Sequence, residues 1–129
     1  MPAAKDLKIL VVDDQRAVRA MIRSSLQGLG INQVIEAEDG VQALDLLSTS
    51  RRHLIISDLN MPHLDGLGLL RAVRQNPETA KTAFIMLTSH ADTELVKKAV
   101  ELGVNNYIIK PFTVESLHRK ITAVFGQLT

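Results

Sequence analysis

Five short apolar runs alternate along the chain with five segments of helical periodicity, and this alternation restricts the fold more than any other feature. The runs cover residues 7–12, 33–37, 53–57, 83–87 and 106–109, and each of them is largely apolar. Such runs are typical of strands whose two faces are both covered by helices. Because right-handed crossovers join parallel strands, the pattern predicts an α/β fold with a doubly wound, five-stranded parallel sheet.

The segments between and after these runs have the apolar spacing of amphipathic helices. In the first segment Val18 and Ile22 lie four residues apart, which places them on one face of a helix. The later stripes contain Val41, Leu44 and Leu47; Leu67, Leu70 and Val73; Leu95, Val96, Ala99 and Val100; and Val114, Leu117, Ile121, Val124 and Phe125. Three glycines are expected where the backbone needs permissive torsions: Gly40, Gly66 and Gly103.

Composition excludes several classes of function. Fifteen basic and 14 acidic residues give a net charge of +1, so the chain has no general attraction for nucleic acid or anionic membranes. The absence of cysteine excludes disulfides, zinc–thiolate sites and cysteine nucleophiles. No apolar stretch approaches the ~20 residues of a membrane span, and we expect a cytoplasmic protein.

Polar residues follow four of the predicted strands at the point where each strand ends: Asp13 and Asp14, Asp58, Thr88, and Lys110. In an open α/β sheet the carboxyl ends of the strands form the edge where ligands bind. Packed carboxylates raise each other's pKa unless a cation lies among them, and oxygen ligands favour Mg²⁺. Mg²⁺ suits phosphoryl chemistry, in which a carboxylate can form an aspartyl phosphate. The alternative is that these acids only cap the helices that follow them.

Four motifs lie in order at the ends of the predicted strands. They are VVDD at 11–14, SDLNMP at 57–62 with DG at 65–66, LTS at 87–89, and YIIKPF at 107–112. Together they resemble the receiver domains of two-component signalling, the CheY-like response regulators. The resemblance covers essentially the whole chain and implies a flavodoxin-like (βα)5 fold with the strand order 2-1-3-4-5. It also implies one receiver domain over residues 1–129.

The resemblance assigns the phosphoryl acceptor and the metal ligands. Asp58 is the expected acceptor, and Asp58 and Asp14 are expected to bind Mg²⁺ directly together with the backbone carbonyl of Asn60. Asp13 is expected to act on the ion largely through water. Lys110 is expected to pair with Asp58 or with the phosphoryl oxygens, and its bond to the following proline resembles the cis peptide of the family.

Further residues resemble those that switch and reset receivers. Thr88 is expected to hydrogen-bond the phosphoryl group, and Tyr107 then turns inward. Asn60 and His90, each two residues after a site residue, are expected to tune the rate of dephosphorylation. The output face of the fourth helix, fifth strand and fifth helix is expected to carry Lys97, Lys98, Tyr107, His118 and Lys120, although lysines and histidines there are also typical of a solvated helix face.

The resemblance implies a response regulator that takes a phosphoryl group from the phosphohistidine of a histidine kinase or a phosphotransfer protein. Such a protein acts catalytically only on its own phosphorylation and dephosphorylation. It signals by contact with a downstream protein, without binding nucleic acid or entering a membrane. Similarity at residues 36–41 and 60–62 favours a stand-alone receiver of the chemotaxis type, whose target is a flagellar motor switch.

Three alternatives remain open at this point. The first is a phosphorelay shuttle or phosphate sink that passes the group to a phosphotransfer histidine. The second is a receiver fragment of a larger transcriptional regulator. The third is a small Mg²⁺-dependent phosphatase, a class that needs an acid two residues after the nucleophile, where this chain has Asn60.

Overall fold

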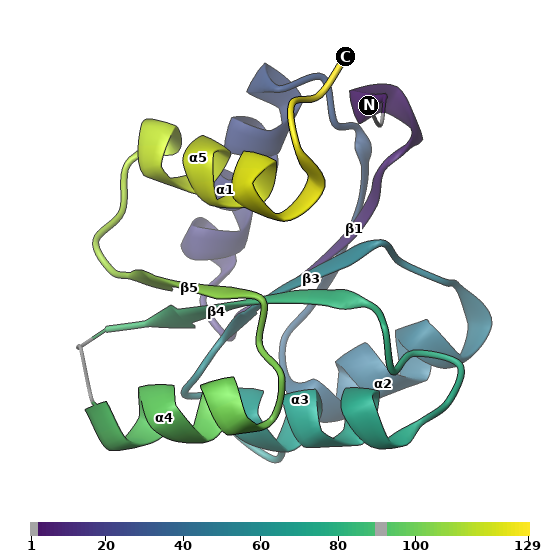
Figure 1. Ribbon diagram of the computed structural model, residues 1–129, viewed down its shortest axis with the longest axis vertical. Helices are drawn as coiled ribbons and strands as arrows, with labels where there is room; N and C mark the ends of the chain where they lie inside the picture. The colour runs from purple at the N-terminus through teal and green to yellow at the C-terminus, as the bar shows by residue number, and fades with distance from the viewer. Residues whose placement is uncertain (1–2, 90–92) are drawn as a thin grey trace.

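The computed structural model describes residues 3–89 and 93–129. Its centre is a parallel sheet with the strand order β2-β1-β3-β4-β5 (Figure 1). The strands are β1 (Lys8–Val12), β2 (Gln33–Ala37), β3 (Leu54–Asp58), β4 (Ala83–Thr88) and β5 (Asn106–Ile109). The structure therefore confirms the predicted doubly wound α/β fold and its strand order.

Helices cover both faces of the sheet (Figure 1). One face carries α1 (Arg16–Gly28) and α5 (Val114–Phe125), and the other carries α2 (Gly40–Thr49), α3 (Gly66–Gln75) and α4 (Thr93–Glu101). A short 3-10 helix, Ala4–Asp6, precedes β1. Within residues 3–89 and 93–129, no helix combines the length and the apolar character needed to cross a membrane.

Burial on both faces explains why the apolar runs form strands. Every residue of the central strands β3 and β4 is buried. In β1 the side chains alternate between the two faces. Ile9 and Val11 join the cluster under α1 and α5, and Leu10 and Val12 join the cluster under α2, α3 and α4. The sheet thus separates two apolar cores and leaves its carboxyl edge for polar residues.

Two strands end one residue later than the sequence pattern indicated. β3 includes Asp58, which pairs in register with Leu87 of β4. β4 includes Thr88, whose carbonyl oxygen accepts a hydrogen bond of 2.7 Å from the Lys110 N–H. These polar residues are therefore the last members of the sheet, which fixes their backbones relative to one another.

Two strands also begin one residue later than predicted. Leu7 closes the 3-10 helix, because its N–H donates to the Ala4 carbonyl oxygen at 3.1 Å. His53 precedes β3, and its backbone N–H donates to the Lys8 carbonyl oxygen at 2.8 Å. In return the Lys8 N–H donates to the His53 Nδ1 at 2.9 Å. His53 therefore joins the start of β3 to β1.

Gly40 and Gly66 serve close packing and not, as predicted, unusual backbone torsions. Of the three glycines expected to need such torsions, Gly103 alone has a positive φ, at +89°. A Cβ atom on Gly66 would lie 2.4 Å from the Asp58 carbonyl oxygen, and one on Gly40 would lie 2.7 Å from the Leu64 carbonyl oxygen. α2 and α3 therefore begin too close to neighbouring backbone to admit a side chain.

Gly66→Ala is expected to lower the free energy of unfolding by about 1–3 kcal/mol, because the added methyl overlaps the backbone that carries Asp58. Gly28→Ala is the matched control, since the nearest atom to a Cβ there is 4.0 Å away. That control is expected to stay within about 0.5 kcal/mol of the wild type. Urea unfolding measures both changes, and equal midpoints for the two variants would contradict the packing argument.

Candidate functional site

Three carboxylates gather at the carboxyl edge of the sheet, and we call this group the acidic site: Asp13, Asp14 and Asp58. Asp13 and Asp14 follow β1, and Asp58 ends the neighbouring strand β3. One ligand oxygen from each residue lies within 4.8 Å of the others. Asp13 is 0% exposed and Asp58 is 8% exposed, whereas Asp14 is open to solvent.

The acids of this site are not helix caps. The cap position of α1 is Gln15, which makes no side-chain capping bond. α2 and α3 are capped instead by Asp39 and Asp65, whose carboxylates each accept a backbone N–H of the first helical turn. The capping alternative therefore applies to those two aspartates. The acidic site needs a different explanation.

Lys110 reaches the acidic site from the end of β5. Its Nζ lies 3.0 Å from the Asp13 Oδ2 and 3.3 Å from the Asp58 Oδ1. The side chain is 20% exposed, and the peptide bond between Lys110 and Pro111 is cis, as the resemblance implied. The ammonium pairs with two carboxylates at once and is closer to Asp13 than to Asp58.

Burial and charge together shift the protonation of the site. Burial raises the pKa of Asp58, the charge of Asp13 raises it further, and the ammonium of Lys110 lowers it only in part. Burial lowers the pKa of Lys110, but its hydrogen bond to Asp13 and the charges of Asp13 and Asp58 outweigh burial, so that its pKa is raised. The site therefore keeps a positive lysine, and its excess of negative charge suits a cation.

The structure brings Thr88 to the same edge and leaves Asn60 outside the core. Thr88 is buried and ends β4. Asn60 is exposed in the loop after β3. His90 lies outside the described residues, so its predicted part in dephosphorylation stays a prediction from the sequence.

The response regulator receiver domain family matches residues 9–122 of the chain. The chain belongs to this family. A probable chemotaxis protein CheY of Rhizobium etli is 47% identical to it over 128 residues, with 99% of both chains covered. Chemotaxis protein CheY-3 of Vibrio cholerae is 37% identical over 124 residues, covering 96% of this chain and 95% of that protein.

Solved receiver structures agree with this assignment. The chemotaxis response regulator CheY4 of Vibrio cholerae superposes with a TM-score of 0.85 at 34% identity, covering 92% of this chain and 98% of that one. A receiver domain of a sensor histidine kinase from Pseudomonas aeruginosa, with a magnesium ion coordinated in its active site cleft, gives a TM-score of 0.84 at 29% identity. That match covers 94% of this chain and 98% of the neighbour.

Tyr107 lies on the edge strand β5 of this receiver domain and is half-buried. Its ring packs against the apolar cluster under α2, α3 and α4. The Lys120 Nζ of α5 lies 5.6 Å from the ring centroid and 3.2 Å from the Asn106 Oδ1. Lys97 and Lys98 are exposed on α4. These residues therefore lie on the elements expected to form the output face.

The prediction that His118 belongs to the output face is wrong. The His118 Nε2 lies 2.9 Å from the carbonyl oxygen of Ser25 on α1. His118 is partly buried between the two helices that share one face of the sheet. Its position on α5, one residue after the buried Leu117, turns it toward α1 and away from Lys120.

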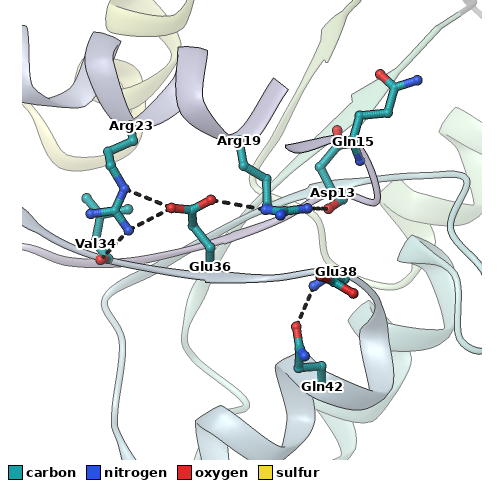
Figure 2. A network of polar contacts seen from close by, with 8 residues as sticks. All are labelled: Asp13, Gln15, Arg19, Arg23, Val34, Glu36, Glu38 and Gln42. Carbon is teal, nitrogen blue, oxygen red and sulfur yellow. Dashed lines mark hydrogen bonds and ion pairs between the residues drawn. The ribbon is translucent and has the colours of Figure 1, made fainter. Parts of the chain in front are cut away.

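The sequence interpretation missed a polar network next to the acidic site of this receiver. Figure 2 shows Arg19 and Arg23 of α1 on either side of Glu36 of β2, with Arg19 also reaching Asp13. Arg19 lies three residues before Ile22 on the buried face of α1. A charged residue within an apolar helical stripe was the signal that could have identified it.

Proposed function

We propose that this protein is a phosphorylation-activated response regulator whose Asp58 accepts a phosphoryl group from a phosphohistidine. The observation that carries the proposal is the acidic site, with three carboxylates within 4.8 Å of one another and the Lys110 ammonium 3.3 Å from Asp58. Membership in the receiver family supports the same reading. The donor would be a sensor histidine kinase or a phosphotransfer protein.

The acidic site fits Mg²⁺. Its donors are carboxylate oxygens, and the Lys110 ammonium balances only part of their charge. We propose that Asp14 and Asp58 bind the ion directly with the backbone carbonyl of Asn60, and that Asp13 acts largely through water. When bound, Mg²⁺ supplies positive charge to the phosphate oxygens. The magnesium ion in the Pseudomonas aeruginosa neighbour supports this assignment.

The proposed transfer uses Asp58 as the nucleophile. A carboxylate oxygen attacks phosphorus and forms an O–P bond, the P–N bond to the donor histidine breaks, and the imidazole nitrogen keeps the electron pair. Lys110 provides positive charge beside the Asp58 oxygen, and the Thr88 hydroxyl donates to the phosphoryl group. Water later attacks phosphorus, the O–P bond to Asp58 breaks, and inorganic phosphate leaves as the Asp58 carboxylate is restored. We propose that Asn60 and His90 tune the rate of this step. The chain acts on no external substrate in this scheme.

Phosphorylation would change the face formed by α4, β5 and α5 and its affinity for a partner protein. With His118 turned toward α1, the polar residues we assign to this face are Lys97, Lys98, Tyr107 and Lys120. The chemotaxis names of the Rhizobium etli and Vibrio cholerae relatives favour a role in motility, with a flagellar motor switch protein as the target. We place this signalling in the cytoplasm.

The proposal is tested by intact mass spectrometry after incubation with Mg²⁺ and acetyl phosphate, a small phosphodonor. The expected result is a gain of one phosphoryl group that requires Mg²⁺ and decays with time. A receiver without phosphoryl chemistry would give no gain at any concentration of donor. A short phosphoryl lifetime, with transfer of the group to an added phosphotransfer histidine and no binding to a motor protein, would favour the shuttle alternative over a terminal regulator.

Mg²⁺ is expected to raise the free energy of unfolding by about 2.7 kcal/mol at a hundredfold excess over its dissociation constant. Asp14→Asn should remove most of this gain and leave the metal-free protein within about 0.5 kcal/mol of the wild type, because Asp14 is exposed. The gain should also shrink as the pH falls, because protons compete for Asp58, whose pKa is raised. Calorimetry with and without Mg²⁺ measures all three, with exposed Asp45→Asn as the control.

A further inference from the structure

Arg19 is a charged residue in an almost fully buried position. It lies on the first turns of α1 and is 8% exposed. Its Nη1 donates to the Asp13 carbonyl oxygen at 2.7 Å, and its Nε donates to the Glu36 Oε1 at 3.0 Å. Side chains of a helix lean toward its N-terminus, so that a residue one turn inside α1 reaches back to the end of β1 (Figure 2).

Asp13 is held at all four of its polar atoms. Its N–H donates to the Ala37 carbonyl oxygen at 3.1 Å, and its own carbonyl oxygen accepts from Arg19. Its Oδ1 accepts from the Gln15 N–H at 2.8 Å, and its Oδ2 accepts from the Lys110 Nζ at 3.0 Å. Two of these bonds hold the backbone of Asp13, and the one from Arg19 is charge-assisted. It acts on the carbonyl that leads directly into Asp14.

Neutralising Glu36 does not explain the position of Arg19. Arg23 already pairs with Glu36, with its Nε 2.9 Å and its Nη2 2.8 Å from the Oε2. The side chain of Arg23 is 35% exposed, against 10% for that of Arg19. What distinguishes the more deeply buried arginine is its bond to Asp13. Glu36 holds the guanidinium of Arg19 in the orientation that this bond requires.

We infer that Arg19 is a positioning residue of the acidic site, which fixes the turn between β1 and α1 and thereby the placement of the Asp13 and Asp14 carboxylates for Mg²⁺. The inference deepens the proposed function and rests on it for the metal. Groups that orient metal ligands set affinity nearly as strongly as the ligands do. The two arginines and Glu36 together also leave one positive charge beside three carboxylates.

Isothermal titration of Mg²⁺ into the full chain tests the inference with matched variants. Arg19→Gln is expected to raise the Mg²⁺ dissociation constant about tenfold or more. Arg23→Gln removes a second arginine of α1 that also pairs with Glu36. It should change the Mg²⁺ dissociation constant by less than about twofold. Arg19→Lys keeps the charge with a single nitrogen and is expected to fall between them. Equal constants for Arg19→Gln and Arg23→Gln would overturn the inference.

Hydrogen exchange of the metal-free proteins tests the positioning role without the metal. The amides of Asp14 and Gln15 should exchange faster in Arg19→Gln than in Arg23→Gln, whereas amides of β4 should exchange alike. Unchanged exchange in the turn would overturn the inference, even if the wild type binds Mg²⁺. If Arg19→Gln does not fold, Arg19→Lys and Arg23→Lys supply the same comparison. Failure of the wild type to bind Mg²⁺ would count against the proposed function, and the exchange measurement would still decide the role of Arg19.

Discussion

Asp58→Asn is expected to abolish phosphoryl incorporation from acetyl phosphate. The amide lacks the nucleophilic oxygen of the carboxylate, and Asp13 and Asp14 occupy different places around the site. Intact mass spectrometry in the presence of Mg²⁺ should show the unmodified mass for this variant under conditions that modify the wild type. Asp45→Asn, an exposed change on α2, is the matched control and should be modified like the wild type.

Loss of folding would be a trivial cause of inactivity, and the charge balance of the site argues against it. The pKa of Asp58 is raised in the folded protein, so the folded state binds this proton more tightly than the unfolded state. Stability is therefore lost as the pH rises from the ordinary aspartate pKa through the raised one. Asp58→Asn has no such loss, and without Mg²⁺ it should unfold at the same or a higher temperature at neutral pH. A less stable variant would contradict this assignment of charge.

Lys110→Met is expected to have the largest effect on stability. The ammonium is the cation paired with Asp13, whose carboxylate is fully buried, and it also pairs with Asp58. Removing one partner of such a pair leaves an uncompensated buried charge. The free energy of unfolding should fall by about 3 kcal/mol, the lower end of the range for buried pairs, because the lysine is partly exposed. Mg²⁺ can compensate the same carboxylates, so it should restore more stability to this variant than it adds to the wild type.

Urea unfolding with and without Mg²⁺ measures both effects, and Lys97→Met on the exposed face of α4 is the control. Phosphoryl incorporation by Lys110→Met should slow on the order of 100-fold, because a positive group beside the transferred phosphoryl is lost. If Lys110→Met and Lys97→Met unfold at the same urea concentration, the ion pairs of Lys110 do not carry the stability assigned to them. An unchanged rate would remove Lys110 from the proposed chemistry.

The fold was predictable because its strands are apolar on both faces. A run such as residues 54–56 is too short for a helix and lies between two helical segments, which indicates a strand covered on both sides, and all three residues are buried. Asp13, Asp58 and Thr88 were predictable for a related reason, since parallel strands bring their carboxyl ends to one edge. The structure brings these residues and Lys110 together as expected.

The features that the sequence did not indicate depend on directions within helices and on distances between them. His118 and Lys120 are two residues apart on α5, yet His118 contacts α1 and Lys120 lies over Tyr107. Gly66 is required because α3 begins against the backbone of β3, a distance that no spacing along the chain encodes. A charged residue in an apolar helical stripe marks Arg19 as unusual, but its bond to the backbone carbonyl of Asp13 has no signature in a sequence.

The position of the phosphoryl group on the chain tests the central claim most directly. Borohydride reduction of the phosphorylated protein converts an aspartyl phosphate to homoserine, and peptide mass mapping then locates that residue. The account predicts homoserine at position 58 and nowhere else, in an amount that depends on Mg²⁺ during phosphorylation. Homoserine at position 13 or 14, or a phosphoryl group that resists reduction and maps to a serine, threonine or histidine, would contradict it.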